Sequence, residues 1–177
     1  IKKCSESQTQ GLDGTLLYPE EMTKFMVNGT KNFNGVVTNA ADIIDFTEEI
    51  EAGEYLVFGL LSTANTAYEV NLEQFTITYL DKKAFDYTKD FSGTQGQDNW
   101  YYNPAQTGFE GNTFVNDTWT NDAKNAGIFG KDVLISPKGG SWGTIAFKAP
   151  QSGWVRVEQN LSVSGGVDGK VLKYGIK

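Results

Sequence analysis

The residue types best suited to binding gather at Phe91-Ser-Gly-Thr-Gln-Gly-Gln-Asp-Asn-Trp-Tyr-Tyr102. Three adjacent aromatics follow a polar run that carries glycine, amide and carboxylate side chains. Flat apolar faces can stack on a sugar ring while short polar groups hydrogen-bond its hydroxyls. The alternative is a turn that leads into a strand whose aromatics belong to the core. Because a strand alternates faces, Trp100 and Tyr102 point one way and Tyr101 the other, so at least one aromatic is expected to face away from the core.

The other tryptophans are further candidates for an exposed sugar-stacking platform. Trp119 sits in the polar stretch 116–122, which has little apolar support, and is the strongest single candidate. Trp142 follows a loop-like Lys-Gly-Gly-Ser run. Trp154 lies on the outward face of a strand by alternation, which suits a surface position and a second-sheet core position equally. The expected carbohydrate-binding set is Trp100, Tyr101, Tyr102, Trp119, Trp142, Gln97, Asp98 and Asn99.

Several kinds of chemistry are disfavoured by composition. The chain has no histidine, which removes Ser–His and Cys–His nucleophiles and His-ligated zinc. Cys4 is the single cysteine, so no internal disulfide can form. The net charge is −7 with one arginine, Arg156, which disfavours a nucleic-acid partner, and no apolar run is long enough to span a membrane. No cofactor is expected.

A structural calcium is the one metal that the sequence leaves open. Asp117, Asp122 and Asp132, with nearby carbonyls, supply the oxygen ligands that calcium prefers. No EF-hand spacing appears, and solvated loop acids are the alternative reading of these three residues.

Short β-rich runs separated by Gly, Asn, Thr, Ser and Asp predict an all-β sandwich or barrel. The length suits a single domain, 1–177, with sequence halves 1–80 and 81–177. In 154–158, Val155 and Val157 are expected to face the core. A short helix or turn is predicted at 19–26, and 42–50 is read as strand followed by turn. The clearest predicted strands are 55–61, 75–80, 133–135, 143–147, 154–158 and 171–174, with others around 15–18, 34–38, 68–72 and 127–129.

Several phrases resemble a known kind of module. They are the 91–102 stretch, Trp119, Ser136-Pro-Lys-Gly-Gly140, Ala149-Pro-Gln-Ser-Gly-Trp-Val-Arg-Val157 and Val167-Asp-Gly-Lys-Val171. In this order they resemble the jelly-roll, carbohydrate-binding-type modules of bacterial secreted and cell-surface glycan-adherence proteins. The resemblance covers roughly residues 85–177.

The first half of the chain resembles segments that normally follow the Asp-Gly strand of such a module. These segments are Thr15–Pro19, Ile50–Phe58 and Phe75–Tyr79, and the two chain ends look as if they were drawn from one strand. The expected fold is therefore a circularly permuted jelly roll, tolerated when termini meet at a surface. A window across tandem copies is the alternative.

The expected function is non-catalytic polysaccharide binding, with an α-glucan such as starch as the favoured ligand. The resemblance implies a secreted or cell-surface bacterial protein with neighbouring domains. The alternative is a structural or adhesive repeat module without a glycan ligand. A glycosidase needs two facing carboxylates, which the sequence does not identify, so no catalytic residue and no enzyme activity are expected.

Overall fold

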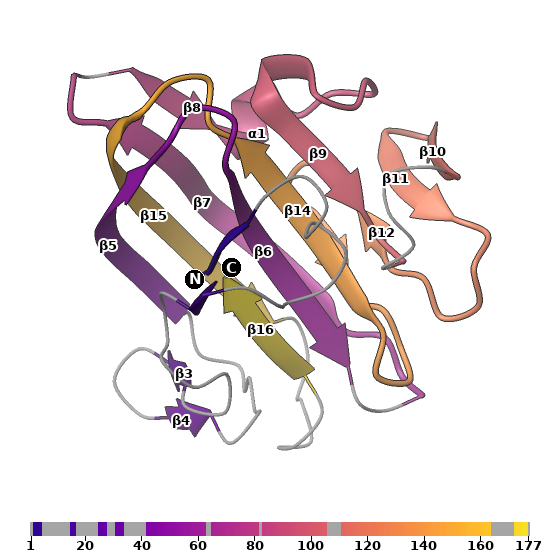
Figure 1. Cartoon of the computed structure of the whole chain (residues 1–177). Helices are drawn as coiled ribbons and strands as arrows, with labels where there is room; N and C mark the ends of the chain where they lie inside the picture. The colour runs from indigo at the N-terminus through magenta and orange to yellow at the C-terminus, as the bar shows by residue number, and fades with distance from the viewer. Residues whose placement is uncertain are drawn as a thin grey trace.

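The computed structural model describes residues 2–4, 15–16, 25–27, 31–33, 42–62, 65–81, 83–105, 111–163 and 172–176. These residues form an all-β sandwich of two antiparallel sheets with one short α-helix, α1 (Tyr87–Asp90) (Figure 1). No helix in this part of the chain has the length and apolar character needed to cross a membrane.

The first sheet is built around β6 (Tyr55–Ser62) and β14 (Trp142–Lys148), which pair along seven positions. Its strand order is β2 (Thr15–Leu16), β1 (Lys2–Cys4), β6 (Tyr55–Ser62), β14 (Trp142–Lys148) and β9 (Trp100–Asn103). A further strand, β16 (Leu172–Ile176), also pairs with β6.

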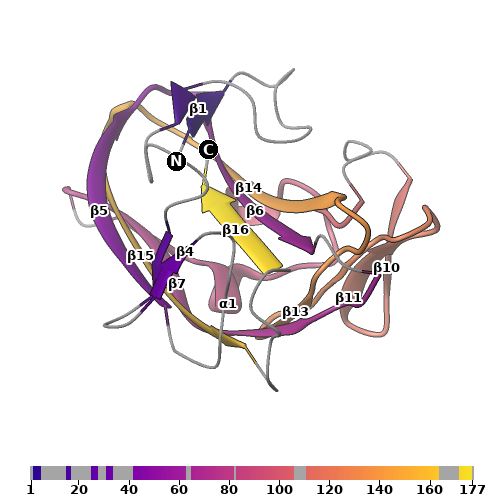
Figure 2. The same cartoon turned by 90° about the horizontal axis from the view of Figure 1, so that it is seen from below.

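The second sheet is built around β15 (Gly153–Val163), which pairs with β7 (Glu69–Tyr79) on one side and with β5 (Asp42–Ile50) on the other. Seen from below, it curves as an arc around the first sheet (Figure 2). β8 (Ala84–Asp86) adds to β7, and β3 (Phe25–Val27) pairs with β4 (Lys31–Phe33) in a separate hairpin. The strand order of the second sheet is β10 (Asn112–Val115), β11 (Thr118–Asn121), β12 (Ile128–Phe129), β13 (Val133–Ile135), β7 (Glu69–Tyr79), β15 (Gly153–Val163) and β5 (Asp42–Ile50).

The core lies between the two sheets and is dominated by aromatic side chains. Trp100 and Phe75 meet edge to face with ring centroids 5.0 Å apart, and Trp100 and Phe147 lie 5.2 Å apart. The alternation predicted for 154–158 is confirmed, because Val155 and Val157 are fully buried while Trp154 and Arg156 are exposed. Large aromatic faces fill the space between sheets in few rotamers, which stabilises one packing arrangement.

Most of the predicted strands are confirmed with shifted ends, and the helix or turn predicted at 19–26 is contradicted where the structure describes that segment. The segment 42–50 is one continuous strand, and 68–72 and 75–80 belong to the single strand β7. The helix predicted at 19–26 is contradicted at Phe25 and Met26, which start β3; 19–24 and 34–38 lie outside the described residues. Helix α1 instead follows Asp86, whose side chain accepts hydrogen bonds from the backbone N–H groups of Thr88 and Lys89.

The two ends of the chain lie in line along one edge of β6 (Figures 1 and 2). Both β16 and β1 run antiparallel to β6: Ile176 lies opposite Phe58, and Lys3 lies opposite Leu56. One residue position therefore separates the end of β16 from Lys3 along that edge. Circular permutation of a jelly roll stays a prediction.

This register predicts how the ends can be joined. A chain in which Ile176 is fused to Lys2, omitting Ile1 and Lys177, and which is opened between Asn116 and Asp117, is expected to fold with a thermal midpoint close to that of the parent. The opening site is an exposed turn whose two residues have φ of 51° and 58°. A variant that also retains Ile1 is the control, because one extra residue offsets β1 and reverses its faces. Equal stability of the two fusions, measured by thermal unfolding, would contradict the register.

Candidate functional site

The polar turn before β9 is used to build the fold. The Gln95 side chain pairs with the Tyr102 backbone as the backbone of an adjacent strand would. Its Nε2 donates to the Tyr102 carbonyl at 2.7 Å, and its Oε1 accepts from the Tyr102 N–H at 2.8 Å. Asn112 Nδ2 donates to the same carbonyl at 2.9 Å. Gly96 has φ of +79°, and a Cβ there would lie 2.9 Å from the Tyr101 hydroxyl, which explains a glycine at this close approach.

Trp100, Tyr102 and Trp119 cannot stack on a ligand, so the expectation that Trp119 forms an exposed platform is wrong. Their exposed fractions are 0%, 0% and 4%. Trp119 lies on β11, stacks on Tyr102 with centroids 5.4 Å apart, and donates its indole N–H to the Ser92 carbonyl at 2.8 Å. The physical reason is that β10 and β11 extend the second sheet, so the inward-facing residue of a polar hairpin covers the end of the core.

The other expected site residues remain nearer the surface. Tyr101 faces away from the core, as alternation predicts, and is half-buried against Tyr55 with centroids 5.6 Å apart. Gln97 and Asp98 are exposed, and Asn99 is half-buried. Gln97 accepts a hydrogen bond from the Ser92 hydroxyl at 2.9 Å. Trp142 begins β14, but its side chain lies outside the described residues.

The acids expected to hold calcium do not form a cluster. Among the described residues, no three acidic or cysteine side chains gather closely enough to hold a metal ion. Asp117, Asp122 and Asp132 are each exposed and therefore match the alternative reading of solvated loop acids.

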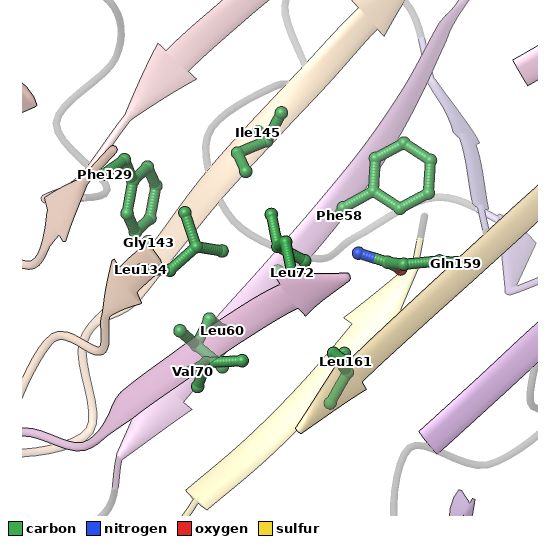
Figure 3. Close-up of a pocket in the computed structure, with 11 residues that line it drawn as sticks. Phe58, Leu60, Val70, Leu72, Phe129, Leu134, Gly143, Ile145, Gln159 and Leu161 are labelled. Carbon is green, nitrogen blue, oxygen red and sulfur yellow. The ribbon is translucent and has the colours of Figure 1, made fainter. Parts of the chain in front are cut away.

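A cavity that the described residues enclose between the sheets is too small to hold a sugar. An interior cavity of about 20 Å³ is lined by apolar side chains from both sheets and by Gln159 (Figure 3). A cavity of that size holds about one water molecule. On the outer face of the first sheet, Tyr55, Val57 and Ala146 are fully buried as well. The second sheet and the turns at its ends remain as candidate surfaces.

An open groove of about 240 Å³ lies where the turn after β7 meets the start of β15. Its apolar wall is formed by Trp154 and Leu80, which are 50% and 66% exposed. Its polar lining comes from neighbouring turn residues. The lining residues are Tyr79, Leu80, Asp81, Gln151, Ser152, Gly153 and Trp154.

The groove is held in shape by hydrogen bonds from three turns. The Tyr79 hydroxyl donates to the Gln151 carbonyl at 2.8 Å, and Gln151 Nε2 donates to Asp81 Oδ2 at 3.1 Å. The Ala52 N–H donates to the Ser152 hydroxyl oxygen at 2.9 Å. The Leu80 N–H donates to the Trp154 carbonyl at 3.1 Å, and this hydrogen bond joins the backbones of the two apolar residues. A ligand would therefore meet a preformed wall rather than a loop that must be ordered on binding.

The sequence predicted an exposed Trp119, which its burial contradicts, and it left Trp154 undecided. The signal that favours Trp154 is the alternation of 154–158, which sets Trp154, Arg156 and Glu158 on one face. The two residues that share this face with Trp154 are both charged, which is typical of a strand face in contact with water. None of the expected site residues whose side chains the structure describes lines the groove.

Comparisons of the chain with protein-family models, with curated proteins and with solved structures found no match.

Burial of Tyr102 in the core predicts loss of stability in alkali. Burial raises the pKa of Tyr102 to about 12 from its ordinary value of 10.0. Because the folded pKa exceeds the unfolded pKa, the protonated hydroxyl contributes full stability below about pH 10. That contribution is lost as the pH rises towards 12, and amounts to on the order of 2 kcal/mol.

The check is denaturant unfolding of wild type and Tyr102→Phe across this pH range. We expect the stability difference between the two chains to shift in favour of Tyr102→Phe above pH 10. The difference in phenolate absorbance between wild type and Tyr102→Phe should show Tyr102 ionising at a higher pH than an exposed tyrosine. A constant stability difference between neutral and alkaline pH would contradict the prediction.

Proposed function

We propose that this chain binds a polysaccharide without cleaving it, and that one sugar ring stacks on Trp154. The observation that carries the proposal is a half-exposed tryptophan set beside a groove of about 240 Å³ with carboxylate, amide and hydroxyl groups in its lining. Trp is normally well buried, so one that is half exposed on a rigid strand next to a hollow is favoured as a recognition residue. The resemblance to carbohydrate-binding modules supports the same function.

The chemistry of the groove suits a sugar. The C–H face of a pyranose is apolar and matches the flat indole, while its ring edge carries hydroxyls that match Asp81, Gln151 and Ser152. Trp154 lies at the first position after Gly153, where the missing side chain leaves backbone within reach of a ligand. The modules that this chain resembles act outside the bacterial cell, and we propose the same location for this chain.

The ligand is best sought among several polysaccharides. The clustered aromatics that favoured a curved α-glucan are buried, so starch keeps no advantage over extended glycans. A single stacking residue predicts weak binding, on the order of micromolar to millimolar.

Affinity gel electrophoresis with soluble starch, xylan, mixed β-glucan and mannan tests the function. Wild type is expected to be retarded by at least one polysaccharide, and Trp154→Ala is expected to migrate as in a gel without polysaccharide. Val115→Ala is the matched control, since Val115 is 51% exposed but lies on β10, outside the groove. Absence of retardation on every gel would reject polysaccharide binding.

A structural or adhesive role is the second candidate. It is favoured by two exposed apolar side chains on the neighbouring strands β12 and β13, Ile128 (41%) and Val133 (37%). Exposed apolar side chains grouped on one face suit a protein contact. Self-association that is lost in an Ile128→Ser/Val133→Ser double variant, together with no glycan binding, would favour this role.

A further inference from the structure

We propose that the Trp154 groove accepts uncharged, hydroxyl-rich sugars and rejects sugar acids, and that Asp81 sets this preference. The inference rests on the proposed polysaccharide-binding function and adds the charge class of the ligand. Three features of the described residues carry it: the hydrogen-bonding character of the lining, the position of the acidic side chains, and the engagement of the nearby cations.

The polar lining includes one carboxylate, Asp81, which can only accept hydrogen bonds when ionised. Asp81 Oδ1 accepts from the Lys83 N–H at 3.3 Å, and Oδ2 accepts from Gln151 Nε2 at 3.1 Å. Each carboxylate oxygen can accept a second hydrogen bond, so Asp81 still has acceptor capacity towards the groove. The lining side chains that can donate to a ligand include the Gln151 amide and the Ser152 hydroxyl, both uncharged. A ligand that carries hydroxyls can donate to Asp81 and accept from these groups.

Acidic side chains also surround the aromatic wall. Glu49 on β5 lies directly opposite Trp154 in the strand register and is exposed, and Glu51 follows it into the next turn, also exposed. A carboxylate on a ligand stacked on Trp154 would therefore meet the negative charges of Asp81 in the groove and of Glu49 on the neighbouring strand. Like charges at such positions repel, and the repulsion weakens with added salt.

The nearest described cations are already engaged elsewhere. Arg156, two residues beyond Trp154 on the same face, donates to both oxygens of Asp45 at 2.8 and 2.7 Å and lies 3.2 Å from Glu158. The Lys83 ammonium lies over the Phe85 ring, 5.0 Å from its centroid. Neither is held in the groove for a ligand carboxylate. Lys82 is in the same turn but lies outside the described residues.

Chemically matched polymer pairs test the preference: soluble starch against carboxymethyl starch, and hydroxyethyl cellulose against carboxymethyl cellulose. At low salt, wild type is expected to bind the neutral member of its preferred pair about tenfold more tightly than the anionic member. Asp81→Asn is expected to reduce that ratio several-fold by improving binding of the anionic polymer. Asp117→Asn is the matched control, because it changes the net charge equally at an exposed turn outside the groove and should leave the ratio unchanged.

The outcomes separate this inference from the function on which it rests. Equal or tighter binding of the anionic member by wild type overturns the charge preference while leaving polysaccharide binding intact. So does an unchanged ratio in Asp81→Asn whose thermal midpoint matches wild type. Tight anionic binding that disappears in Lys82→Gln would overturn the preference and assign the groove a cation instead. If no polymer binds, or if Trp154→Ala binds as wild type does, the proposed site falls and the inference falls with it.

Discussion

Replacement of Trp119 by alanine is expected to lower the free energy of unfolding by about 3–5 kcal/mol. The side chain is 4% exposed, stacks on Tyr102 and packs against Phe114, so its removal leaves a cavity at the end of the core. It also removes the donor for the Ser92 carbonyl, which anchors the turn before β9. The loss is a large part of the stability of an ordinary domain.

Denaturant unfolding, followed by tryptophan fluorescence and circular dichroism, measures this change. Trp119→Phe is the partial control, since it keeps most of the ring packing but lacks the indole N–H, and its loss is expected to be smaller. Unfolding of Trp119→Ala at the same denaturant concentration as wild type would contradict the burial of Trp119. It would also restore the hypothesis that this tryptophan is a surface platform.

Replacement of Trp154 by alanine is expected to have the opposite pattern: a loss of polysaccharide affinity of at least about tenfold, with stability changed by roughly 0.5 kcal/mol or less. Trp154 is 50% exposed on the outer face of its sheet, so truncation opens no space inside the core, while it removes the indole on which a sugar ring would stack. Trp154→Phe keeps a smaller flat face and is expected to retain part of the affinity.

Isothermal titration with the polysaccharide selected by the gels measures the affinity, and thermal unfolding measures the stability. The two tryptophans form a paired test, because one should affect only stability and the other only binding. If Trp154→Ala lost stability as Trp119→Ala does, Trp154 would be a packing residue and the groove would lose its central wall. If it kept full affinity while binding was present, the ligand would bind elsewhere.

The turn motif at 91–102 shows why residue types alone misplaced the site. Amide, hydroxyl and aromatic side chains are what sugar recognition requires, but the same groups satisfy a strand edge and fill a core. Gln95 uses both ends of its amide on the backbone of Tyr102, and Ser92 receives the indole N–H of Trp119. These contacts join residues up to 27 positions apart, and periodicity in a single segment carries no information about them.

The faces of the strands could be predicted, but their exposure could not. Alternation correctly set Val155 and Val157 on the core side and Tyr101 on the opposite side from Trp100. The outward face of the first sheet is nevertheless buried at Val57 and Ala146, while the outward face of the second sheet is exposed at Trp154. Period-two patterning distinguishes the two faces of a strand and does not reveal whether a further layer covers the outer one.

The sequence by itself determined the class of fold: frequent turn residues between short β-rich runs are a local property, and local sterics and hydrogen-bonding needs act through neighbouring residues. It also determined the acidic charge and the absence of histidine chemistry. Only the tertiary structure decided that Trp119 is core and Trp154 is surface, and that Asp81 and Gln151 meet beside it. Those outcomes depend on which strands pair across the sheets and which turns gather at one end, and burial is a property of that assembly rather than of any one segment.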